Sequence, residues 1–67
     1  MHDTNNAKTM FRRFYPEKNV HIYSIKEISG DKALIETKFP DGIFYFIVHG
    51  NTVSPSYDTE NEALRNV

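Results

Sequence analysis

Apolar residues near the start of the chain recur with the spacing of a helix. They fall at positions i, i+3, i+4 and i+7, namely Ala7, Met10, Phe11 and Phe14. This pattern predicts a helix from Asn6 to Tyr15 that is capped by the side chain of Asn6. Pro16 ends the pattern, because proline has no amide hydrogen and disfavours helical geometry in the preceding residue. Residues 1–5 are polar, and we expect them to form a flexible N-terminal end.

The middle of the chain is rich in β-branched and aromatic residues. The segment "NVHIYSIKEI" predicts a strand from Val20 to Ile28, with a bulge near Ser24 where the apolar residues change phase. A short helix with the isoleucines on one face is the alternative for this segment. The next segment, "ALIETKF", alternates with period 2, which predicts a strand with one buried face over residues 33–39.

The sequence "FPDGI" predicts a tight turn between two strands. Pro40 presets the first turn position and Gly42 accepts left-handed geometry, so we expect a three-residue loop with a bulge at Gly42. The strand that follows, Ile43 to Val48, is apolar on both faces. Phe44, Phe46 and Val48 share one face, and Ile43, Tyr45 and Ile47 share the other. Such a strand is typically central in its sheet and covered on both sides.

The last third of the chain predicts a turn, a short strand and a helix. Gly50-Asn51 supplies the turn, and Pro55 restricts the following strand to a short edge position. Thr59 and Glu62 form the S/T-x-x-E capping box of a C-terminal helix. The predicted fold is therefore α+β: a small antiparallel β-meander of three to four strands, with a short N-terminal and a short C-terminal helix packed on the sheet. We expect residues 6–67 to form this single domain.

Composition narrows the class of protein. Hydrophobic residues make up 39% of the chain and aromatic residues 13%, which is too many for a disordered protein. The chain has no cysteine, which fits a reducing compartment. No apolar run approaches the roughly 18 residues that span a membrane, and the polar N-terminus does not resemble a signal peptide. We expect a soluble, cytoplasmic protein without a membrane partner.

Residues that could carry chemistry are few and scattered. His21 and His49 could begin a metal site if the first and third strands were neighbours, but no third ligand stands out. The serines lie outside any nucleophile motif such as G-x-S-x-G. A chain of 67 residues also has little room for a ligand pocket of roughly 300–1,000 Å³. We therefore expect no enzyme activity, no catalytic residue, no metal, no cofactor and no small-molecule substrate.

The segment "KTMFRRFYPEK" interleaves basic and aromatic residues, a pattern that can bind nucleic acid. The residues available for phosphate contacts are Lys8, Arg12, Arg13 and Lys18. Against this interpretation, the net charge is −1, and the lysines of the predicted strands are offset by acidic residues. Phe11 and Phe14 belong to the apolar face of the helix, so we expect them in the core and the two arginines in solvent. A small nucleic-acid-binding module is the alternative function.

The two-sided strand leads to the main functional hypothesis. Two helices of about ten and eight residues can together cover one face of the sheet, or they can split between the faces and cover each in part. In either case apolar surface should remain exposed. An exposed apolar patch usually marks a protein–protein site. We expect a non-catalytic interaction protein, either a homodimer or the binder of a larger protein, comparable to phage or mobile-element accessory and inhibitor proteins.

The choice of face decides which residues would form that interface. If Phe39, Phe44, Phe46 and Val48 face the helices, the expected interface residues are Tyr23, Leu34, Tyr45 and Ile47. The two faces could also be exchanged. In a further alternative, the first strand and the N-terminal aromatic residues close the second face within one molecule.

Overall fold

A computed structural model describes residues 3–67 of the chain, which form two helices and four strands. In chain order these are α1 (Asp3–Phe14), β1 (His21–Ser29), β2 (Lys32–Phe39), β3 (Gly42–His49), β4 (Thr52–Val53) and α2 (Glu60–Arg65). The strands form one antiparallel sheet in the order β1-β2-β3-β4. The predicted α+β meander with a helix at each end is therefore confirmed. Within residues 3–67, neither helix has the length and apolar composition needed to cross a membrane.

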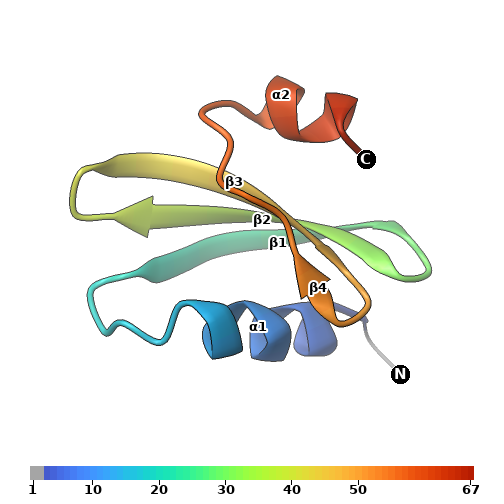
Figure 1. Ribbon diagram of the computed structural model, residues 1–67, viewed down its shortest axis with the longest axis horizontal. Helices are drawn as coiled ribbons and strands as arrows, with labels where there is room; N and C mark the ends of the chain where they lie inside the picture. Colours follow the sequence, from blue (N-terminus) through green and yellow to red (C-terminus); the bar gives the residue numbers. More distant parts are fainter. Residues whose placement is uncertain (1–2) are drawn as a thin grey trace.

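The two helices lie on opposite faces of the sheet (Figure 1). β3 is thus covered on both sides, as its two apolar faces require. Each end of the chain supplies one of the two outer layers.

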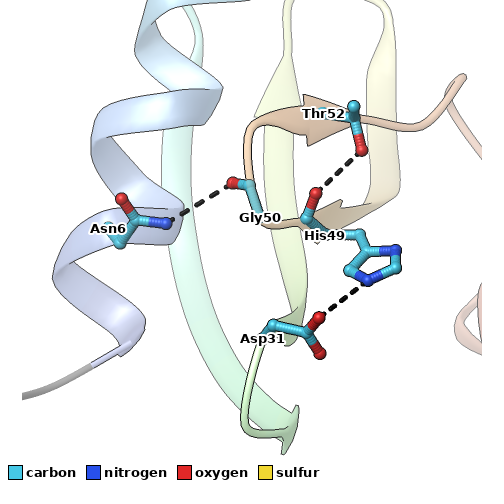
Figure 2. Close-up of polar contacts among 5 residues, drawn as sticks. All are labelled: Asn6, Asp31, His49, Gly50 and Thr52. Carbon is cyan, nitrogen blue, oxygen red and sulfur yellow. Dashed lines mark hydrogen bonds and ion pairs between the residues drawn. The ribbon is translucent and has the colours of Figure 1, made fainter.

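Helix α1 starts earlier than predicted. It begins at Asp3, so Asn6 lies inside the helix and is not its cap. The side chain of Asn6 instead donates a hydrogen bond from Nδ2 to the carbonyl of Gly50 at 3.5 Å (Figure 2). Residues 3–5 of the expected flexible end belong to α1, and residues 1–2 lie outside the described residues.

The main core lies between α1 and the sheet. Its buried residues are Ala7, Met10, Phe11, Val20, Ala33, Ile35, Phe46 and Val48. Three rings meet at its centre, because the centroid of Phe46 lies 5.0 Å from those of both Phe11 and Tyr15. Aromatic pairs at this separation contribute about 0.5–1.5 kcal/mol each beyond the area that they bury.

Phe14 was expected in this core but is 54% exposed. Asn6, Met10 and Phe14 lie on one i, i+4 row of α1, and the first of them bonds to Gly50 in the β3–β4 turn. Of this row, Met10 belongs to the main core, whereas Phe14 is exposed like Asn6.

The first strand contains the predicted irregularity. The register between β1 and β2 shifts between Ile22 and Ser24, which leaves Tyr23 without a partner across the ladder. The bulge predicted near Ser24 is confirmed, and the alternative of a short helix in this segment is wrong. A second shift follows between Glu27 and Ser29.

The β2–β3 turn is tighter than expected. Phe39 pairs directly with Gly42, so the loop contains only Pro40 and Asp41, and the predicted three-residue loop with a bulge is wrong. A bulge would have needed a left-handed glycine outside the ladder. Gly42 instead has a φ of 154°, an angle that residues with a Cβ atom rarely adopt, and it remains within the ladder.

The connection to α2 follows the predicted chemistry in part. Thr59 caps α2, because its Oγ1 accepts a hydrogen bond from the backbone N–H of Glu62 at 3.1 Å. The other half of the capping box is displaced by one residue, since Oε1 of Glu62 accepts from the N–H of Asp58 at 3.3 Å. Upstream of the cap, Tyr57 forms two backbone hydrogen bonds with Tyr45, of 2.8 and 2.9 Å, which fix where the chain leaves the sheet.

Two glycines in turns provide a matched test of the backbone. Gly50 has a left-handed φ of 59°, whereas Gly30 has no positive φ, and at both positions an added Cβ would meet no atom within 4 Å. We expect Gly50→Ala to lower the free energy of unfolding by about 1–2 kcal/mol, because a Cβ disfavours left-handed geometry. Gly30→Ala should change it by less than about 0.5 kcal/mol. Urea titrations of both variants would measure this, and equal losses would contradict it.

Candidate protein-binding surface

The face of the sheet opposite α1 is covered by α2 over one part only. Leu34, Ile47 and Ala63 form a second buried cluster, and Tyr45 and Tyr57 pack against it. Leu34 and Ile47 are cross-strand neighbours, so they form a single row across the sheet. Ala63 is the only residue of α2 that is buried. This short helix therefore covers one row of the sheet.

Two of the expected interface residues lie under this helix. Leu34 and Ile47 are 4% and 6% exposed, so they are not accessible to a partner in this conformation. The interface residues were expected on the condition that both helices face Phe39, Phe44, Phe46 and Val48, but only α1 lies there, and the helices are split between the two faces. The physical reason is the path of the chain after β4, which carries α2 to the opposite side (Figure 1).

Beyond the row covered by α2, the same face continues without a helix above it. Tyr45 pairs with Glu36, which in turn pairs with Ser24, and the next row contains Ile43 and Lys38. None of these five residues is buried, and Ile43 is 44% exposed. We call this set, Ser24, Glu36, Lys38, Ile43 and Tyr45, the open half-face.

The open half-face combines an apolar side with a polar side. Ile43 and Tyr45 line it along β3. Along β2, Glu36 accepts a hydrogen bond from Oγ of Ser24 at 3.2 Å, and Nζ of Lys38 donates one to the carbonyl of Phe39 at 3.0 Å. Aliphatic and aromatic side chains next to charged groups resemble the junction between the core and the rim of a protein interface.

Ile43 was not among the interface residues expected from the sequence. Its face was predicted correctly, because it alternates in step with Tyr45 and Ile47 along the strand. Tyr23, by contrast, is 59% exposed at the bulge of β1 and belongs to neither buried cluster. The structure thus brings Leu34, Tyr45 and Ile47 together and leaves Tyr23 apart.

The basic N-terminal segment has a structural role at one of its arginines. The guanidinium of Arg12 donates to three carbonyls of the loop after α1: Val20 at 2.7 Å, Glu17 at 3.3 Å and Tyr15 at 3.5 Å. The expectation that Arg12 points into solvent is therefore wrong. Lys8, Arg13 and Lys18 are exposed.

The aromatic residues of this segment are only partly available for stacking on bases. Phe11 is fully buried, and Tyr15 packs against Phe11, Phe39 and Phe46 with centroid distances of 5.0–5.9 Å. Phe14 is the one ring of "FRRFY" with an exposed face of appreciable size. The combination of cations and stacking rings that single-stranded nucleic acid requires is therefore divided between the surface and the core.

The described residues contain no group of three potential metal ligands. His21 pairs across the ladder with Lys38 and His49 with Lys32, so the two histidines lie at opposite ends of β2 and on either side of it. Nε2 of His49 lies 2.8 Å from Oδ2 of Asp31, and both side chains are exposed (Figure 2). This pair links two turns at the end of the sheet.

Two hollows flank this end of the molecule, with volumes of about 260 and 190 Å³. Both are smaller than the roughly 300–1,000 Å³ of typical ligand pockets. The larger lies beside Asn6, Asp31 and Gly50, and the smaller lies beside His49 and Val67. The smaller hollow is also lined by Thr52 and Ser54, whose hydroxyls donate to the backbone carbonyls of His49 and Pro55 rather than to the imidazole of His49.

Comparisons with protein-family models, with curated proteins and with solved structures found no match to this chain. No relative therefore suggests a ligand or a partner. Function is inferred from the chain's own surfaces, among which the open half-face contains the exposed Ile43 and the half-buried Tyr45.

The two neighbouring arginines distinguish a structural from a surface role. We expect Arg12→Ala to lower the free energy of unfolding by about 1–3 kcal/mol, because it leaves loop carbonyls without their donor. Arg13→Ala removes an exposed side chain and should change it by less than about 0.5 kcal/mol. Thermal or urea unfolding of the two variants would measure the difference. Equal stability would show that the hydrogen bonds of Arg12 contribute nothing.

Proposed function

We propose that this protein is a non-catalytic protein-binding module whose binding site is the open half-face. The observation that supports the proposal is the incomplete cover of the sheet by α2. The buried contact of α2 covers Leu34 and Ile47, whereas on the same strand face Ile43 is exposed and Tyr45 is half-buried at the border of that contact. An apolar strip bordered by charged residues is the surface type expected at a protein interface.

The physical gain from binding comes from the apolar side of this surface. Covering Ile43 and Tyr45 would remove apolar area from water at roughly 25 cal/mol per Å². Glu36 and Lys38 already make internal hydrogen bonds, so less side-chain freedom is lost when a partner orders them. These charges would then select a partner with complementary groups at the rim of the contact.

The same features suggest an accessory or inhibitor protein that acts by occupying a surface of a larger protein. His21 lies at the opposite end of β2 from the exposed His49–Asp31 pair, and binding through the open half-face requires none of these side chains. The absence of cysteine from the chain fits a cytoplasmic location, which we include in the proposal.

The alternative, a small nucleic-acid-binding module, would depend on Lys8, Arg13 and Lys18. Arg12 is occupied by the loop carbonyls, which lowers the number of cations free for phosphates. An affinity that falls steeply as salt rises would favour this alternative, because phosphate contacts release counterions. A titration of labelled single- and double-stranded oligonucleotides at two salt concentrations would measure it.

The binding site can be tested with one substitution on each face of the sheet. Ile43→Lys places a charge on the apolar side of the proposed contact, and Phe14→Lys is the matched control on the α1 side, since both side chains are about half exposed. We expect immobilised wild-type protein and the Phe14→Lys variant to retain the same protein from nuclease-treated extract of the source cells. The Ile43→Lys variant should retain at least about tenfold less, because a lone charge is costly to bury.

Circular dichroism and thermal unfolding would establish that both variants remain folded. Retention that depends on Phe14 and not on Ile43 would contradict the proposed site. If a protein were retained from untreated extract and none from nuclease-treated extract, the result would instead support the nucleic-acid alternative.

A further inference from the structure

The two edges of the sheet differ in how their backbone groups are satisfied. On the β4 side, the chain after β4 continues to bond to β3: the N–H of Ser54 donates to Ile47, and Tyr57 exchanges two bonds with Tyr45. β4 itself has two residues and is soon followed by Pro55. The other edge is β1, which has nine residues and pairs only with β2. β1 is thus the long open edge within the described chain.

The alternation of hydrogen bonds identifies which groups of β1 are free. Ile47 bonds outward to the chain after β4, so its neighbour Leu34 bonds in the other direction, to Lys26 of β1. The residues on either side of Lys26 then direct their N–H and C=O groups away from the sheet. These are Ile25 and Glu27, and none of the described residues bonds to those groups.

We propose that β1 pairs in antiparallel fashion with β1 of a second copy of this chain, about a two-fold axis at Ile25. This contact joins two four-stranded sheets into one sheet of eight strands by strand addition, in which free main-chain groups supply the bonds. It goes beyond the proposed function, since it uses the edge of the sheet rather than the open half-face.

The charges of β1 select this register. When two copies of β1 pair about a two-fold axis, the residues whose N–H and C=O groups point out of the sheet must lie opposite one another. This condition allows the axis to pass through Ile25, Lys26 or Glu27. An axis at Lys26 or at Glu27 sets like charges directly opposite one another, which destabilises the pair. An axis at Ile25 avoids both clashes and sets Lys26 opposite the partner's Ser24.

The register at Ile25 also brings opposite charges together. Oγ of Ser24 donates to Glu36 at 3.2 Å, on the same face of the sheet as Lys26. Within its own chain the ammonium of Lys26 lies 3.6 Å from Oε2 of Glu60 in α2, and both side chains remain exposed. In the dimer this ammonium would also lie next to the Ser24–Glu36 pair of the partner, and symmetry repeats this contact. On the other face, Ile25 packs at the border of the main core and would meet its own copy, which extends the apolar layer.

The two bulges set the extent of the contact. The register shifts lie at Tyr23 and at Ile28, and an axis at Ile25 sets Glu27 opposite the partner's Tyr23, so the stretch that is regular on both strands runs from 24 to 26. Bulges of this kind limit the pairing of an edge strand. The dimer should accordingly be weak and should dissociate on dilution.

Sedimentation equilibrium of the full chain, from micromolar to millimolar concentration, tests the proposal. We expect a reversible monomer–dimer equilibrium. Glu27→Pro should weaken it at least about tenfold, because the outward N–H is replaced by a ring that obstructs a neighbouring strand, a change that edge strands tolerate. Circular dichroism of the variant monitors the fold.

A charge substitution tests the register itself. Ser24→Lys sets like charges opposite each other at two symmetric positions, and we expect the dissociation constant to rise about tenfold. Within one copy, the new ammonium lies next to Glu36, so the fold should be retained. Adding Lys26→Glu together with Glu60→Lys, which keeps an ion pair between β1 and α2 in each copy, should restore an opposite-charge pair between the copies and recover association. Asn61→Lys adds the same charge at an exposed position of α2 and should leave association unchanged.

A protein that remains monomeric at every concentration would overturn the proposal. So would a dimer that neither Glu27→Pro nor Ser24→Lys weakens. If Ile43→Lys alone abolished dimerisation, the second copy would occupy the open half-face, which would overturn edge pairing while it supported the proposed binding site. If the dimer formed through β1 and the Ile43→Lys variant still retained the protein from cell extract, the proposed binding site would be wrong, whereas the proposed dimer would be supported.

Discussion

Both faces of β3 are apolar, and the rest of the structure is arranged around that constraint. Phe46 and Val48 point to one side of the sheet and Ile47 points to the other. Apolar side chains stabilise the folded state only when they are removed from water, so the strand requires a layer above and a layer below. A chain of 67 residues with a helix at each end has one helix for each face. The three-layer arrangement in Figure 1 follows from that match.

The two layers are unequal, and this difference creates the candidate binding surface. At 1.5 Å per residue, the 12 residues of α1 extend over about 18 Å and the six of α2 over about 9 Å. β3 has eight residues, or roughly 27 Å at 3.4 Å each. α2 is therefore long enough to cover at most about a third of the strand, and the hydrogen bonds between Tyr45 and Tyr57 fix where the chain leaves β3 on its way to α2. Ile43 lies at the uncovered end.

The sequence was sufficient for the features that local periodicity encodes. The order of the elements, the two-sided central strand, the bulge in β1 and the cap at Thr59 all follow from spacing or from the chemistry of one residue. The start of α1 did not follow, because Asn6 can cap a helix or bond elsewhere, and here it bonds to Gly50 across the fold. The β2–β3 loop was misjudged because Gly42 can adopt either a bulged or an extended conformation.

The candidate site was less predictable, because it depends on contacts between segments. Leu34 and Tyr45 lie on the same face, and nothing in their alternation distinguishes the buried one from the accessible one. The footprint of α2 makes that distinction, and a bridge between residues twelve positions apart places α2. Arg12 illustrates the same limit, since its partners are backbone carbonyls, which every residue type carries. A run of basic and aromatic residues therefore cannot show whether its cations are turned inward or outward. In a chain this small, helix length and helix placement decide which of the remaining apolar residues can meet a partner.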